Sequence, residues 1–121
     1  MKKICYLFAI VFCLFGCSEQ STPNLRGKTF TLNNSNITLS FDIRESKFYG
    51  KALNNYFGNY KLDKNQITFE LVGTTMMMGS PSEVEEETKY FNNLSKINFY
   101  HLENKQLILK GEYTELIYKE N

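Results

Sequence analysis

The sequence predicts an α+β domain, mainly β: a strongly curved antiparallel sheet of about eight strands, or a partly open barrel, wrapped around one helix. Three observations predict this. Apolar and polar residues alternate in short runs, polar turn residues separate the runs, and one longer segment carries the start signals of a helix. A sheet with one apolar face and a helix with one apolar stripe can cover each other.

The strand predictions rest on the alternating runs. In the clearest run, residues 37–43, every second side chain is apolar, which is typical of a strand with one buried and one wet face. Polar turns such as residues 33–36 separate the runs. The expected strands are residues 30–32, 37–43, 47–50, 57–62, 66–71, 97–103, 106–110 and 113–119. The side chains expected on the inner face include Phe30, Leu32, Ile37, Leu39, Phe41, Ile43, Ile67, Phe69 and Leu71.

One helix is expected to begin at Ser80. Ser80 suits the N-cap, Pro81 suits the first helical position, and Glu83 is placed to complete a capping box. Acidic residues 85–87 lie near the positive end of the helix dipole. Consecutive helical residues point about 100° apart, so we interpret this triplet as a solvated face rather than a metal site. The expected apolar face is Val84, Thr88, Phe91 and Leu94.

Residues 1–16 are expected to be a cleaved export signal. A basic start precedes an apolar run at residues 4–15, which is shorter than the roughly 20 residues that span a membrane. An uncleaved anchor is the alternative. Residues 17–26 are polar and contain Pro23, so we interpret them as a tether. Residues 27–119 remain as a single domain.

Cys17 is expected to carry a lipid. The segment Leu14-Phe15-Gly16-Cys17 resembles the bacterial lipobox, whose cysteine receives diacylglycerol, although Phe15 is bulkier than the usual residue. Ser18 follows where an inner-membrane retention signal would have Asp. The expected location is therefore the periplasmic face of the outer membrane.

Composition argues against a disulfide in the domain and against nucleic-acid binding. Cys5 and Cys13 lie in the apolar run and leave with the signal, so the domain has no thiol for a disulfide once Cys17 is acylated. Lys2 and Lys3 also leave, which reduces the 14 basic residues to one fewer than the 13 acidic ones. Because no basic cluster is present, nucleic-acid binding is not expected.

No cofactor, metal or enzymatic activity is expected. His101 is the single histidine and has no evident partner for general base catalysis, so we interpret it as structural or solvent-edge. The methionines at 76–78 could bind Cu(I), but only the first and third would share a face, and core filling is favoured. Cross-strand packing is favoured over a ligand face for the aromatic residues Tyr49, Tyr56, Phe57 and Tyr60.

Two segments resemble a known family. Residues 50–60, Gly-Lys-Ala-Leu-Asn-Asn-Tyr-Phe-Gly-Asn-Tyr, resemble the G-x-x-C-N-x-aromatic-x-G-x-Y pattern of the META domain, the HslJ-like heat-shock protein family. Residues 75–79, Thr-Met-Met-Met-Gly, resemble its T-R-M-x-C pattern, which is also followed by a helix. The matching positions are Gly50, Asn54, Gly58, Tyr60, Thr75 and Met77.

The departures from the family pattern concern three positions. Leu53 and Gly79 stand where the family often has cysteines, and Met76 stands where it often has arginine. If those cysteines pair in relatives, losing both avoids an orphan thiol, and Leu53 is expected to pack where a bridge would have been. The missing arginine argues against a function that needs a cation there.

The resemblance implies a small, β-rich, non-enzymatic domain of the cell envelope, often lipid-anchored and sometimes linked to heat or envelope stress. We therefore expect a lipoprotein held to a membrane by lipid on Cys17, which supports the envelope or its stress response through an envelope protein partner. The matching residues are expected to maintain the fold. Two alternatives remain: a lipocalin-like carrier of a small apolar ligand, and an inhibitor of an exported hydrolase that presents residues 72–80.

Overall fold

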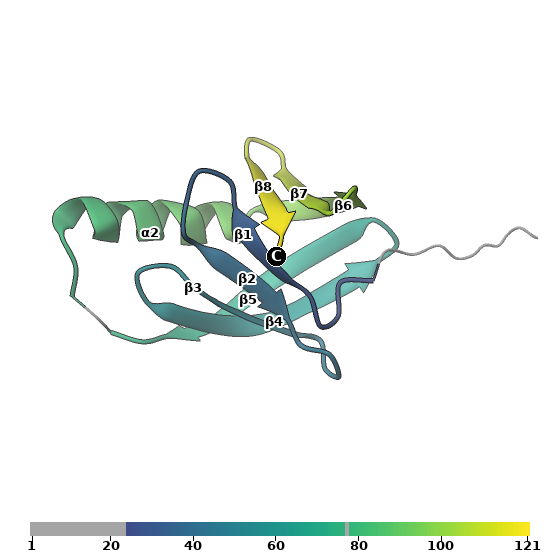
Figure 1. Ribbon diagram of the computed structural model, residues 1–121, viewed down its shortest axis with the longest axis horizontal. Helices are drawn as coiled ribbons and strands as arrows, with labels where there is room; N and C mark the ends of the chain where they lie inside the picture. Colours follow the sequence, from purple (N-terminus) through teal and green to yellow (C-terminus); the bar gives the residue numbers. More distant parts are fainter. Residues whose placement is uncertain (1–23, 77) are drawn as a thin grey trace, which may run out of the picture.

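The strands of this chain pair in sequence order and close into a barrel. The computed structural model describes residues 24–76 and 78–121. Its elements are β1 (Thr29–Leu32), β2 (Thr38–Phe41), β3 (Lys47–Lys51), β4 (Asn55–Asp63), β5 (Gln66–Thr74), α2 (Pro81–Leu94), β6 (Ile97–Glu103), β7 (Gln106–Gly111) and β8 (Glu115–Glu120). Each strand is antiparallel to the next, and β1 pairs with β8 to close the barrel (Figure 1). The predicted mainly β architecture is confirmed, and the sheet takes the form of a barrel.

Some expectations fall on residues that the structure does not describe. The export signal, Cys17 and the tether up to Pro23 lie outside the described residues. Within residues 24–76 and 78–121, no helix combines the length and the apolar character needed to cross a membrane.

The barrel has a short seam between β5 and β6. β4 and β5 form a long hairpin and pair along their whole lengths. β6 meets β5 at a single register position, where Gln66 lies opposite Phe99. From residue 67 to residue 74, β5 therefore has a strand neighbour on one side only, within the described part of the chain. Figure 1 shows α2 on the opposite side of the molecule from the β4–β5 hairpin.

Aromatic rings fill the barrel interior. Phe41 and Tyr60 meet edge to face with ring centroids 5.1 Å apart, and Phe48 and Phe69 meet in the same way at 5.2 Å. Such pairs add about 0.5–1.5 kcal/mol to the gain from burial alone. The buried hydrophobic residues are Leu25, Phe30, Ile37, Leu39, Phe41, Phe48, Tyr56, Tyr60, Ile67, Phe69, Tyr90, Leu94, Ile97, Tyr100, Leu107, Leu109, Leu116 and Tyr118.

Ile43 does not lie on the inner face, contrary to the prediction, and is 68% exposed. β2 ends at Phe41 because the next residue starts a turn. The Asp42 carboxylate accepts hydrogen bonds from the backbone N–H groups of Glu45 at 2.8 Å and Arg44 at 2.9 Å. These bonds hold the pKa of Asp42 below its ordinary value. The alternation therefore stops one residue before Ile43.

Leu71 was also expected inside, but it is 38% exposed. It lies opposite Gly58 of β4, beside a register irregularity between Phe57 and Gly58. This part of β5 lies beyond the seam, where no strand of the described chain pairs with its other side. The other predicted inner residues are buried, except Leu32, which is partly buried.

The start of α2 is confirmed. The Ser80 side-chain oxygen accepts a hydrogen bond from the backbone N–H of Glu83 at 3.2 Å. The Glu83 carboxylate accepts one from the backbone N–H of Ser80 at 2.9 Å. Pro81 occupies the first helical position, where its missing N–H has no helical partner to lose.

The buried face of α2 differs from the predicted one. Val84 and Thr88 are exposed, whereas Phe91 is partly buried and Leu94 is buried. The fully buried positions of the helix are Glu87, Tyr90 and Leu94. The stripe that meets the barrel is therefore rotated away from Val84 and Thr88, and it contains two polar side chains.

Three buried tyrosine hydroxyls connect α2 to the barrel. The Tyr56 hydroxyl donates to the carbonyl oxygen of Thr38 at 2.6 Å. It also lies 2.7 Å from the Tyr90 hydroxyl, which lies 2.8 Å from the Tyr118 hydroxyl. The single hydroxyl hydrogen of Tyr56 is used in the bond to the Thr38 carbonyl. Tyr90 must therefore donate to Tyr56, and Tyr118 must donate to Tyr90. We call this chain of hydrogen bonds the tyrosine relay.

The relay must remain protonated. Burial raises the pKa of Tyr56, Tyr90 and Tyr118 above the ordinary value of 10. A phenol whose pKa is raised by folding stabilises the fold below its unfolded pKa. That stabilisation is lost as the pH rises above about 10, where the unfolded chain releases the proton first.

Tyr90→Phe is expected to destabilise the protein by about 1–3 kcal/mol, because it removes the central hydroxyl and leaves the Tyr118 hydroxyl without its acceptor. Urea denaturation followed by circular dichroism measures the free energy of unfolding.

Tyr60→Phe is the matched control. The Tyr60 hydroxyl is also buried but has no hydrogen-bond partner among the described residues. We expect its removal to leave the free energy of unfolding unchanged or to raise it. An equal loss of stability for both substitutions would contradict the relay's special role.

Candidate functional site

Three segments meet at a polar cluster beside α2. The turn between β3 and β4 supplies Asn54, the residue after β5 is Thr75, and α2 supplies Glu87. The Glu87 carboxylate accepts from the backbone N–H of Asn54 at 2.6 Å and from its side-chain amide at 3.0 Å. The Thr75 hydroxyl donates to the Asn54 side-chain oxygen at 3.2 Å. We call this arrangement the Asn54 cluster.

Backbone pairing supports the same junction. The Thr75 hydroxyl accepts a hydrogen bond from the backbone N–H of Asn55 at 3.1 Å, and the Thr75 N–H donates to the Asn55 carbonyl at 3.0 Å. The two segments that carry the family pattern are thus in direct contact. The fold-maintaining role expected of Asn54 and Thr75 stays a prediction, which their substitution would test.

Glu87 corrects the interpretation of the acidic triplet. The prediction placed residues 85–87 on a solvated face, but only Glu85 and Glu86 are exposed. Glu87 is 8% exposed, and the backbone N–H and side-chain amide of Asn54 donate three hydrogen bonds to its two carboxylate oxygens. Hydrogen bonds to a carboxylate are stronger than neutral ones and offset the cost of removing it from water. Its helical spacing to Tyr90 and Leu94 is the signal that would have found it.

Gly50 and Gly58 allow close approach between strands. A Cβ on Gly50 would collide with the Thr38 carbonyl oxygen and lie 2.8 Å from the Tyr56 hydroxyl. A Cβ on Gly58 would collide with the Glu70 carbonyl oxygen. Gly50 therefore leaves the space in which Tyr56 reaches Thr38, and the tyrosine relay depends on it.

Tyr60 and Met77 complete the predicted set. Tyr60 is buried inside the barrel, away from the Asn54 cluster, where its ring contacts Phe41. Met77 lies outside the described residues. The predicted residues are therefore not one site: Asn54 and Thr75 come together, whereas Gly58 and Tyr60 serve the barrel.

Leu53 and Gly79 lie side by side. A Cβ on Gly79 would be 2.8 Å from one terminal methyl carbon of Leu53 and 3.0 Å from the other. Leu53 thus occupies the space into which a side chain at position 79 would project. This contact agrees with the expectation that Leu53 packs where a bridge would have been.

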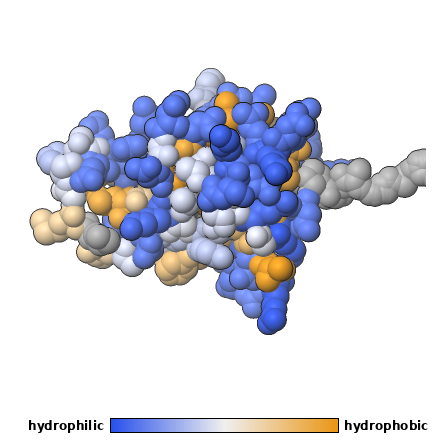
Figure 2. All heavy atoms as spheres, viewed as in Figure 1, coloured by the Kyte–Doolittle hydropathy of each residue, from blue (hydrophilic) through white to orange (hydrophobic). Residues whose placement is uncertain are grey.

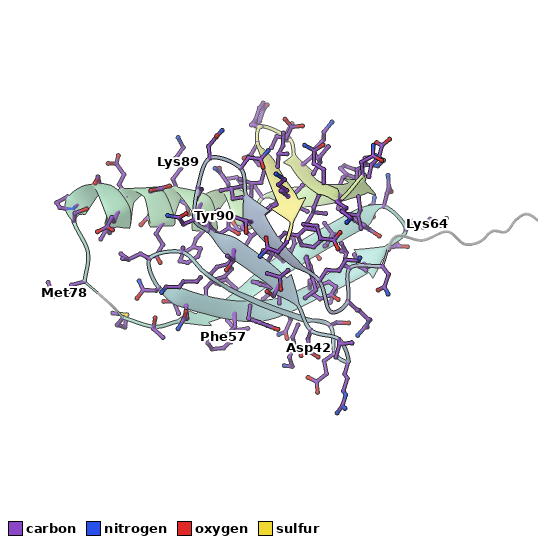
Figure 3. The ribbon with its side chains drawn as sticks, viewed as in Figure 1. Asp42, Phe57, Lys64, Met78, Lys89 and Tyr90 are labelled. Atoms are coloured by element: carbon purple, nitrogen blue, oxygen red, sulfur yellow. The ribbon has the colours of Figure 1, made fainter. Side chains whose placement is uncertain are left out.

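The methionine prediction was wrong. Met76 is 93% exposed and Met78 is 96% exposed, so neither fills the core. Figure 3 shows Met78 at the same end of the molecule as the start of α2 and below it in this view. Within residues 24–76 and 78–121, no group of three or more His, Cys, Asp and Glu side chains is arranged to hold a metal ion.

The aromatic candidates divide between two faces. Tyr56 and Tyr60 are buried, whereas Tyr49 and Phe57 are about half exposed on the outer wall of the barrel, at 51% and 50%. His101 is at the solvent edge, as predicted, with its Nε2 2.8 Å from the exposed Glu103 carboxylate.

A polar cleft of about 330 Å³ adjoins the Asn54 cluster. Its lining residues are Asn34, Ser35, Asn36, Ile37, Ala52, Leu53, Glu83, Glu86 and Glu87. The Glu87 oxygens are engaged by Asn54, and Glu83 accepts from Ser80. Two of the three carboxylates of this cleft, Glu83 and Glu87, thus fix the helix in place, whereas Glu86 is exposed.

The chain belongs to the META domain family, whose model matches residues 20–121. This agrees with the family resemblance of its two segments. No curated protein sequence matches the chain.

Solved structures share the fold. A protein from Burkholderia xenovorans, solved by NMR, is similar with a TM-score of 0.69 and 19% identity over 88% of this chain and 96% of that chain. Another protein solved by NMR has a TM-score of 0.63 and 22% identity over 83% and 94%. A DUF4847 family protein from Bacteroides vulgatus ATCC 8482 has a TM-score of 0.59 and 17% identity over 70% and 59%. These likenesses concern the fold alone.

Asn54→Ala is expected to lower the free energy of unfolding by about 2 kcal/mol, because the buried Glu87 carboxylate loses amide donors. Asn55→Ala is the matched control, since the Asn55 side chain is exposed and its change should stay within about 0.5 kcal/mol. Urea denaturation of both variants measures the difference, and equal values would show that the cluster contributes nothing.

Leu53→Cys combined with Gly79→Cys is expected to form a disulfide under oxidising conditions and to stabilise the fold by roughly 3 kcal/mol. Mass spectrometry with and without reductant detects the bond, and thermal unfolding measures its effect. Free thiols after oxidation would contradict the side-by-side placement of residues 53 and 79. Equal stability of the oxidised and reduced double variant would also contradict it.

Proposed function

We propose that this chain is a non-enzymatic lipoprotein of the cell envelope, anchored by lipid on Cys17, which supports the envelope or its stress response through protein contacts. The observation that supports the proposal is a segment that resembles a lipobox, followed by a short polar stretch and a barrel with a packed interior. The proposed location is the periplasmic face of the outer membrane, supported by Ser18 after the cysteine.

The packed interior favours this role over a lipocalin-like carrier. A carrier needs a cavity lined by the inward side chains. Here inward rings contact one another, as Phe41 does with Tyr60 and Phe48 with Phe69. The space that a small apolar ligand would need is occupied by the protein's own side chains.

The engagement of the family residues supports a non-enzymatic role. Asn54 and Thr75 bond to each other, and Asn54 also bonds to Glu87. Gly50 and Gly58 serve strand packing. These positions therefore contribute to the stability of the fold, and acylation of Cys17 is the chemical step that we propose for the chain.

An inhibitor of an exported hydrolase is a second candidate, and one observation favours it. Such an inhibitor would present exposed anchor residues on residues 72–80. Val72, Met76 and Met78 are exposed apolar side chains of this segment. An inhibitory contact with a hydrolase would use these residues as apolar anchors.

Cys17→Ala in the native host is expected to abolish labelling by radioactive palmitate and to release the protein from membrane fractions. The reason is that the Cys17 sulfur is the atom to which the lipid is attached. Cys13→Ala is the control, because Cys13 lies inside the apolar run of the signal. A Cys17→Ala protein that still carries fatty acid would defeat the assignment.

A further inference from the structure

The outer wall of β3 and β4 carries an exposed aromatic pair. Tyr49 of β3 lies directly opposite Phe57 of β4, and each side chain keeps about half of its surface exposed. Figure 3 shows Phe57 below β4, on the side of the molecule away from α2. The two rings form one apolar strip across neighbouring strands.

Within the domain, the Phe57 ring of this strip packs over the neighbouring strand β5. Phe57 lies opposite Gly73 of β5, and a Cβ on Gly73 would be 2.9 Å from the tip of the Phe57 ring. The ring therefore leans over a glycine, which gives it a shallow seat. Figure 2 shows apolar groups along the lower edge of an otherwise largely polar face.

Lysines flank the aromatic pair. Lys47 and Lys51 precede and follow Tyr49 on the same side of β3, and Lys61 lies further along β4. All three are exposed. β3 and β4 hold one acidic residue, Asp63 at the end of β4. We call the outward side chains of these two strands the β3–β4 wall.

Neighbouring acids only partly neutralise the wall. Glu45 lies 4.0 Å from the Lys47 ammonium, with both side chains exposed, so this pair is weak. Glu70 of β5 approaches Asn59 at 3.5 Å. No ion pair to Lys51 or Lys61 is formed within the described residues.

The opposite side of the molecule carries the opposite charge. The exposed residues of α2 include Glu83, Glu85 and Glu86, with Lys89 as the helix's single cation. Figure 1 shows α2 above β4, and Tyr56 is the β4 side chain that reaches the helix, so the outward side chains of β4 lie on the side away from α2. The described domain is therefore polarised, with a basic aromatic wall on one side and an acidic helix on the other.

The tether would keep the domain beside a membrane. From Cys17 to Pro23 the chain has seven residues, which span at most about 25 Å when extended. An anchor of this length gives the domain a high effective concentration at the bilayer, so a weak contact is enough to orient it.

From the wall and the tether together, we infer that the β3–β4 wall docks on the surface of an anionic lipid bilayer. Tyr49 and Phe57 enter the headgroup region, and Lys47, Lys51 and Lys61 face lipid phosphates. Aromatic residues prefer this interfacial region, and each lysine near an anionic surface adds to binding. The inference rests on the proposed anchor at Cys17, and it adds a fixed orientation with α2 facing away from the bilayer.

A tryptophan reporter tests the inference, because the chain contains no tryptophan. Full-length lipidated Phe57→Trp protein is reconstituted into vesicles of equal parts phosphatidylcholine and phosphatidylglycerol with brominated acyl chains. We expect a blue-shifted emission and the loss of about half of the fluorescence by bromine quenching. The matched reporter is Tyr113→Trp, at a position 91% exposed in the turn between β7 and β8, and it should be quenched little.

Charge variants test the role of the lysines. Lys51→Gln together with Lys61→Gln should reduce quenching of the Phe57→Trp reporter on anionic vesicles, and each change should weaken docking about five-fold. Lys89→Gln on α2 is the matched control and should leave the quenching unchanged. Vesicles of phosphatidylcholine alone should give less quenching than anionic ones.

Two readouts separate the docking from the anchor. Co-flotation of the protein with vesicles reports lipidation, and quenching reports the orientation of the wall. Protein that floats but shows equal quenching of both reporters, or no quenching of either, would overturn the docking and leave the anchor intact. A wall that contacts a protein partner instead would give this same unquenched result. Protein that fails to float would refute the anchor instead.

Discussion

The tyrosine relay is the constraint on which the arrangement of helix and barrel depends. Its hydrogen bonds run from β8 through α2 to β4 and end on a carbonyl of β2. Every proton in the chain has a defined direction because Thr38 can only accept. The helix is therefore fixed by directional bonds as well as by apolar contact. Gly50 is part of the same constraint, since a side chain there would push Tyr56 away from Thr38.

Local patterns predicted most of the fold. Alternation identified the strands, and the Ser80 capping box marked the start of α2, because both depend on neighbours in sequence. The failures have nonlocal causes. Ile43 lies in a turn that the Asp42 side chain stabilises, and Leu71 lies on a stretch of β5 that β6 does not reach. Where a neighbouring strand ends is a property of the whole barrel.

The site was predictable only in part, for a related reason. The family pattern identified Asn54 and Thr75, and the structure joins them. Glu87 was missed because an acidic residue near a helix start is ordinarily solvated, and its burial depends on Asn54, distant in sequence. The methionines at 76 and 78 are apolar but exposed, so their residue type gave the wrong placement. Both errors show that burial is decided by partners that the local sequence does not reveal.

The seam between β5 and β6 has a mechanical consequence. A barrel resists deformation because every strand is hydrogen-bonded to a neighbour on both sides. Between β5 and β6 this pairing is reduced to one register position, Gln66 opposite Phe99. Local opening requires the fewest broken hydrogen bonds there, so the barrel would split along this line before any other. Among the described strands, the stretch of β5 beyond the seam is then supported along its length by β4 alone, while its far end is tied to α2 through Tyr56 of the tyrosine relay and through the Asn54 cluster. The domain therefore combines a part that is fixed to α2 by hydrogen bonds with a stretch of β5 that, within the described residues, has strand pairing on one side only.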